Sequence, residues 1–88
     1  MDLKTIFNLI ANNLKVILRE IELKDINYDS KLCLLGANSV DRAELIEKTI
    51  EDLRIDVDRF EFHSASNIGE LTDLFFEKIK KQPIWLMN

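Results

Sequence analysis

The chain has 88 residues, of which 47% are hydrophobic, and this length suits one compact domain. Its 12 basic and 16 acidic residues give a net charge of -4, which argues against the basic surface that nucleic-acid binding requires. A single cysteine, Cys33, excludes an internal disulfide, and no apolar run approaches the roughly 18 residues of a membrane span. We therefore expect a cytoplasmic monomer that binds neither nucleic acid nor membrane.

The N-terminal stretch predicts a first helix of about five turns. Its apolar residues recur at spacings of three and four and therefore share one face: Leu3, Ile6, Phe7, Ile10, Leu14, Ile17 and Ile21. From Glu22 to Asn38 this period fails, and Asp29, Ser30 and Gly36 supply turn chemistry. The segment is predicted to be a long ordered loop, and loops of this length are usually functional.

Two more helices are predicted in the middle of the chain. A second long helix ends near Arg54, and its predicted core face is Val40, Ala43, Ile46, Ile50 and Leu53. Phe60 and Phe62 flank Glu61 in a stretch too short for a long helix. They predict a single short third helix that contributes an aromatic pair to the core.

The last predicted helix begins after Asn67, which can cap it, with Glu70 completing a capping box. Pro83 ends this helix near Lys81. The fold class is therefore an all-α bundle of four helices, three long and one short, with a long first loop. Residues 1–82 form the domain, and residues 83–88 form a C-terminal tail whose apolar side chains we expect to pack on the bundle: Ile84, Trp85, Leu86 and Met87.

The net negative charge lies in one segment. Residues 39–63 contain eight acidic and four basic residues, whereas acids and bases balance in the segments before and after it. Such a segment steers basic partner surfaces toward whatever it displays. The pattern predicts a docking surface.

Ser39 stands where the long loop becomes the second helix, in the sequence Gly36-Ala37-Asn38-Ser39-Val40. A hydroxyl at a helix N-terminus is exposed, and the free amides and dipole there stabilise a phosphate attached to it. The structural alternative is that Ser39 or Asn38 only caps the helix, with Asp41 three residues after Asn38. Spacing alone favours the cap.

No catalytic group is predicted. His63 is the only histidine, and nothing in the sequence places it beside Ser39 or Cys33 as a general base. Asp56 and Asp58 match the start of a calcium loop, but Phe60 takes the next ligand position. An enzyme is therefore the least favoured class, and no metal site is predicted.

From about Leu3 to Lys81 the chain resembles an acyl carrier protein, through the Gly-x-Asn-Ser-Val setting of Ser39, the long loop before it and the acidic helix after it. The resemblance implies that Ser39 carries a covalent 4'-phosphopantetheine, added from coenzyme A by a phosphopantetheinyl transferase. The usual pattern has Asp before the serine and often Leu after it, whereas this chain has Asn38 and Val40. Which transferase accepts Asn38 is left open.

Three segments are similar to free-standing donor carriers of polyketide β-branching cassettes: Asn38–Glu44, Asn67–Leu71 and Asp73–Phe75. This similarity implies an acyltransferase that loads malonyl, a decarboxylating ketosynthase-like enzyme that leaves acetyl, and a hydroxymethylglutaryl-synthase-like acceptor. Partner contacts are expected at Asn38, Val40, Asp41, Arg42, Glu44, Glu47 and Glu51. Two alternatives remain, a general fatty-acid or polyketide carrier and an unmodified helical adaptor.

Overall fold

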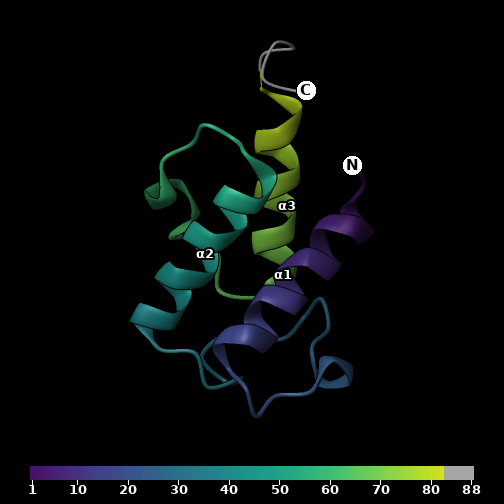
Figure 1. Ribbon diagram of the computed structural model, residues 1–88, viewed down its shortest axis with the longest axis vertical. Helices are drawn as coiled ribbons and strands as arrows, with labels where there is room; N and C mark the ends of the chain where they lie inside the picture. The colour runs from purple at the N-terminus through teal and green to yellow at the C-terminus, as the bar shows by residue number, and fades with distance from the viewer. Residues whose placement is uncertain (83–88) are drawn as a thin grey trace.

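The computed structural model describes residues 1–82, whose regular elements are all helical (Figure 1). Three α-helices are joined by loops that contain two short 3₁₀ helices: α1 (Leu3–Ile17), η1 (Leu23–Asp25), α2 (Ser39–Leu53), η2 (Arg59–Phe62) and α3 (Ile68–Lys80). Both α2 and α3 pack on α1, and η2 packs on α2. The all-α prediction is confirmed, with η2 as the predicted short helix and η1 as a turn that the sequence did not indicate.

Helix α1 begins at Asp2, whose carboxylate accepts a hydrogen bond of 2.8 Å from the amide of Thr5. The predicted apolar face is buried in its middle, at Ile6, Ile10 and Leu14. The helix is shorter than predicted and ends at Ile17 rather than Ile21. Leu18 caps its C-terminus and donates its amide to the carbonyl of Leu14, and the ammonium of Lys15 then donates to the carbonyls of Arg19 and Ile21 in the turn that follows.

The long loop between α1 and α2 is ordered by backbone hydrogen bonds to the start of α3. The amides of Ile68 and Gly69 donate to the carbonyls of Ser30 and Tyr28, over 3.0 and 2.7 Å, and the amide of Leu32 donates to Ser66. Ile26, Leu32 and Ala37 from this loop are buried in the core. The loop therefore forms a wall of the bundle and fixes the point at which α2 begins.

Helix α2 buries most of the predicted face: Ile46 is buried, and Ile50 and Leu53 are half-buried and pack against the core. Its buried residues are Leu45, Ile46 and Thr49, and Asn13 of α1 donates to the hydroxyl of Thr49 over 3.2 Å. Val40 is 72% exposed, so its prediction as a core residue is wrong. It lies in the first turn, ahead of the stretch of α2 that the rest of the bundle covers.

Phe60 and Phe62 do not form the predicted aromatic pair in the core. Phe62 is fully buried, but its ring stacks on Phe75 of α3 with centroids 4.2 Å apart, whereas Phe60 is 61% exposed. Four residues of 3₁₀ helix turn neighbouring aromatic side chains in different directions, so only one of them faces the core.

Helix α3 begins as predicted after Asn67, whose side chain accepts from the amide of Glu70 over 2.7 Å. The predicted capping box is not completed, because the Glu70 carboxylate accepts instead from the amide and hydroxyl of Ser66. The helix ends at Lys80, one residue before the predicted end. Pro83 and the predicted apolar tail lie outside the described residues.

Candidate functional site

Ser39 is the first residue of α2 and its side chain is exposed. The residue that caps the helix is Asn38, whose side chain accepts from the amide of Asp41 over 2.8 Å. Asp41 completes the capping box by accepting from the amide of Asn38 over 3.1 Å. The cap is therefore complete without Ser39, whose hydroxyl makes no hydrogen bond to any other group within residues 1–82.

The position of Ser39 suits a covalently attached anion. The first-turn amides of α2 and the positive end of its dipole face the region that a phosphate on Ser39 would occupy. Because the side chain of Ser39 is exposed, a group attached to its oxygen need not displace any core side chain. The geometry supports a modified serine and assigns it no part in holding the helix.

A hollow of about 110 Å³ adjoins Ser39, between α2 and η2. It is lined by Ser39, Arg42, Ala43, Ile46 and His63. The imidazole of His63 is stacked on the exposed ring of Phe60, with centroids 5.2 Å apart. The sequence did not predict this arrangement, because η2 returns to α2 only in three dimensions.

Arg42 connects the start of α2 to the segment after η2. Its guanidinium donates to the carbonyl of Ala65 over 2.7 Å and more weakly to that of His63 over 3.4 Å. Its Nε is buried and has no partner among residues 1–82. Arg42 was predicted to contact partners as an outward charge, and the structure shows that much of its donor capacity is used inside the molecule.

The acidic residues predicted to meet a partner lie on the outer side of α2. Glu44, Glu47 and Glu51 are exposed, and Glu47 forms an ion pair with Arg59 of η2. Asp41 is half-buried and belongs to the cap. Asn38 and Val40 are exposed on either side of Ser39.

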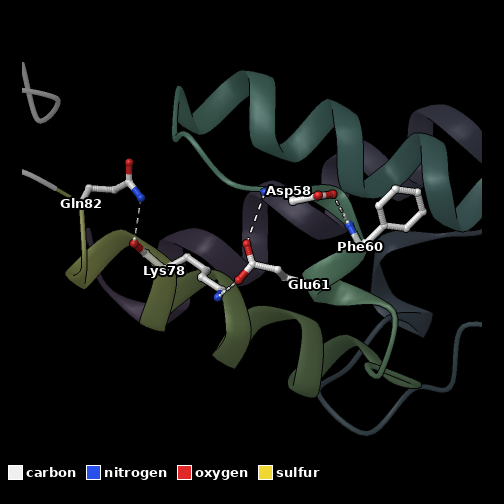
Figure 2. Close-up of polar contacts among 5 residues, drawn as sticks. All are labelled: Asp58, Phe60, Glu61, Lys78 and Gln82. Atoms are coloured by element: carbon white, nitrogen blue, oxygen red, sulfur yellow. Dashed lines mark hydrogen bonds and ion pairs between the residues drawn. The ribbon is translucent and has the colours of Figure 1, made fainter.

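Figure 2 shows how η2 is held against α3. The Glu61 carboxylate accepts from the backbone amide of Asp58 over 3.3 Å and pairs with the ammonium of Lys78, while Asp58 caps the amide of Phe60 over 3.0 Å. The Lys78 hydrogen bond, followed by that of the Asp58 amide, holds the pKa of Glu61 below its usual value. The Asp-x-x-Glu spacing of a capping box was visible at Asp58, but nothing in the sequence indicated Lys78.

The remaining candidates are separate from this site. Cys33 is an exposed free thiol in the loop. Within the described part of the chain, no cluster of three or more His, Cys, Asp or Glu side chains is placed to hold a metal ion. None of the helices in residues 1–82 has the length and apolarity to cross a membrane.

Two known proteins are similar to this chain over most of its length. The polyketide biosynthesis acyl-carrier-protein AcpK of Bacillus subtilis (strain 168) is 36% identical over 80 residues, which are 91% of this chain and 98% of AcpK. A chain in the crystal structure of the curacin biosynthetic pathway HMG synthase in complex with acetyl donor-ACP superposes with a TM-score of 0.83. It is 37% identical, and the match covers 89% of this chain and 100% of that one. No protein-family model matches the sequence.

Proposed function

This chain belongs to the acyl carrier protein family, and on that premise we propose that Ser39 is the residue to which its prosthetic arm is attached. Acyl carrier proteins hold acyl groups on a covalent 4'-phosphopantetheine and leave catalysis to their partners. In the proposed modification, the Ser39 oxygen forms a phosphodiester with the phosphopantetheine of coenzyme A, whose nucleotide bisphosphate leaves. The hydroxyl proton passes to the transferase.

The surroundings of Ser39 support this assignment. Its hydroxyl is exposed and free of the helix cap, which Asn38 and Asp41 complete between them. The phosphodiester would lie at the N-terminus of α2, where an anion gains about 0.3–1 kcal/mol at the surface. Residues 1–82, which hold Ser39 in this position, are the carrier domain of the proposal.

We further propose that the acyl group is acetyl, produced from malonyl by decarboxylation, and that the chain donates it to a hydroxymethylglutaryl-synthase-like enzyme during polyketide β-branching. The support is the similarity to the donor carrier in the HMG synthase complex, which extends over 89% of this chain. An acyltransferase would load malonyl and a decarboxylating ketosynthase-like enzyme would remove its carboxylate. These two partners follow from the proposed order of steps, in which malonyl is loaded first and is then decarboxylated to acetyl.

The proposed partner surface is the outer side of α2 around Ser39. Glu44, Glu47 and Glu51 give this surface negative charge and attract basic partner surfaces, while the exposed side chain of Val40 adds an apolar contact beside the arm. Arg42 contributes mainly by holding the segment after η2 against α2. Association should therefore weaken as salt concentration rises.

The attachment is tested by intact mass spectrometry after incubation with coenzyme A and a transferase of broad specificity. Wild type should gain the mass of one phosphopantetheine, and Ser39→Ala should gain none. Ser64→Ala, at another exposed serine, is the matched control and should be modified like wild type. A wild-type chain that stays unmodified with every transferase tried would favour the helical adaptor instead.

The donor role is tested separately with chain loaded with labelled acetyl. The label should pass to the active site of the HMG synthase of the curacin pathway. A general fatty-acid or polyketide carrier would instead support normal chain extension and fail in this transfer. The two experiments test the attachment of the arm and the donation of acetyl separately, because the mass measurement does not depend on the acceptor enzyme.

A further inference from the structure

Arg42 is a half-buried cation that has no anionic partner within residues 1–82. Its guanidinium donates there only to the carbonyls of Ala65 and His63, which are neutral acceptors. Both of these hydrogen bonds use Nη2, and the buried Nε has no partner in the same part of the chain. A guanidinium that is partly removed from water and lacks a counter-charge is costly, so an anion placed beside it is stabilised.

The anion is supplied by a neighbouring residue. Ser39 and Arg42 are three residues apart in α2, and residues at this spacing are neighbours on a helix surface, with Cβ atoms about 5–6 Å apart. Both residues line the hollow of about 110 Å³ between α2 and η2. One water-sized group needs roughly 10–15 Å³ of such volume, so the hollow has room for the oxygens of a phosphate on Ser39.

No acidic side chain lines this hollow. Apart from Ser39 and Arg42, its walls are formed by Ala43, Ile46 and His63, so Arg42 supplies their only permanent charge. A charge interaction in such partly apolar surroundings is stronger than the same interaction in open water. The hollow therefore favours a single anion close to Arg42.

The unused donors of Arg42 suit a phosphate. Nη1 makes no hydrogen bond to another group within residues 1–82, so its two N–H groups are available while Nη2 stays on the carbonyl of Ala65. A guanidinium binds phosphate oxygens through charge-assisted hydrogen bonds, which are roughly twice as strong as neutral ones. The carboxylate of Asp41 does not take this place, because it accepts from the amide of Asn38 in the capping box.

We infer that Arg42 is a positioning residue for the prosthetic arm and binds the phosphodiester on Ser39 through Nη1. The modification supplies the counter-charge that the guanidinium lacks in the unmodified chain. Because Arg42 also holds the carbonyl of Ala65, the phosphate is fixed relative to the segment after η2, and the arm leaves Ser39 on the side of α2 that faces η2. This inference rests on the proposed attachment at Ser39.

The test compares melting temperatures of the unmodified and the phosphopantetheinylated chain, for wild type, Arg42→Met and Lys48→Met. Modification should raise the melting temperature of wild type by about 2–6 °C more than that of Arg42→Met, as one partly exposed ion pair predicts for a domain of this size. Loss of the Ala65 contact lowers both forms of Arg42→Met and cancels from this difference. The favourable effect of the helix N-terminus on the phosphate remains in every variant.

Lys48→Met is the matched control, because it removes one positive charge from the same helix at a residue that does not line the hollow. Its rise in melting temperature on modification should equal that of wild type. Arg42→Lys keeps a cation at the position but loses the planar fork, and it should retain part of the rise.

Phosphorus NMR of wild type tests the contact even if Arg42→Met fails to fold or to be modified. The chemical shift of the phosphodiester is measured in the folded chain and in the same chain unfolded in urea. A phosphate bound by Arg42 should resonate away from its position in the unfolded chain, and the folded Arg42→Lys chain should lie between the two. Identical shifts in folded and unfolded wild type would contradict the contact.

The outcomes separate the role of Arg42 from the attachment itself. An equal rise in wild type and Arg42→Met would leave Arg42 with its contact to Ala65 alone and overturn the inference, while Ser39 would remain the attachment site. A rise reduced as much in Lys48→Met would show a general effect of charge on α2 and would also overturn it. A wild-type chain that gains no mass with coenzyme A would contradict the attachment and the contact together.

Discussion

Gly69 lies directly against Tyr28, with its amide donating to the Tyr28 carbonyl over 2.7 Å. A Cβ on Gly69 would be 2.8 Å from that oxygen and 2.5 Å from Cδ2 of the ring. The ring is also held from two other sides, because its hydroxyl donates to Asp73 over 2.9 Å and its face meets Phe7. This contact joins the long loop to the start of α3.

Gly69→Ala should therefore destabilise the fold, by about 1–3 kcal/mol as for other overpacked sites. Alanine is the better helix former, but the gain in propensity is about 1 kcal/mol at most and is smaller in a first turn. Urea unfolding measures the change. Glu77→Ala, at an exposed position of the same helix, should stay within about 0.5 kcal/mol of wild type.

The cap and the proposed modification site are adjacent and should respond differently to alanine. Asn38→Ala removes the acceptor for the Asp41 amide and should cost about 0.5–2 kcal/mol of unfolding free energy. Ser39→Ala removes an exposed hydroxyl outside the cap and should cost less than about 0.5 kcal/mol. Equal losses in the two unmodified variants would contradict the division of roles between these residues.

Arg54 ends α2 in the left-handed conformation, with φ 55° and ψ 40°. This conformation is unfavourable for a residue with a Cβ, and glycine adopts it without that cost. Arg54→Gly should raise the unfolding free energy by about 0.5–1 kcal/mol, after the greater backbone entropy of glycine in the unfolded chain, which opposes folding, is subtracted. Arg54→Ala separates the backbone effect from removal of the charge and should show no such gain.

The hydrogen bonds on Glu61 give stability a dependence on pH. They lower its pKa in the folded chain below the ordinary 4.5, so this contribution is fully present above that pH and is lost as the pH falls through the lowered value. Glu61→Gln should unfold at lower urea than wild type at pH 7, and the difference should shrink on acidification. Glu77→Gln is the control, and a difference that grew toward low pH would contradict the assigned sign.

Much of the fold could be predicted because the spacing of apolar residues along the sequence indicates which face of a helix is buried. Ile6, Ile10 and Leu14 are on the predicted face of α1, and the Asn67 cap marks the start of α3. The C-terminal end of α1 was not predictable in this way, because the turn after it is held by Lys15 through the carbonyls of Arg19 and Ile21, a contact that apolar spacing does not record. Apolar spacing likewise extends through Ile21, which stays half-buried after the helix has ended.

The site was predictable only in part. Local spacing placed Asn38, Ser39 and Asp41 at a helix start, and it left open whether Asn38 or Ser39 forms the cap. The contacts of Arg42 with Ala65 and of Glu61 with Lys78 join segments that are 23 and 17 residues apart. No local pattern encodes such pairs, since they depend on how η2 returns to the bundle.

Asn38 and Asp41 form the capping box of α2, so the side chain of Ser39 contributes little to the stability of the turn in which it lies. Addition or removal of a bulky group there should change neither the register of α2 nor the burial of Leu45 and Ile46. The empty and loaded forms would then share one scaffold, so enzymes that meet the carrier in succession must discriminate by what protrudes from it. The polypeptide would then need no refolding between successive cycles of loading and unloading.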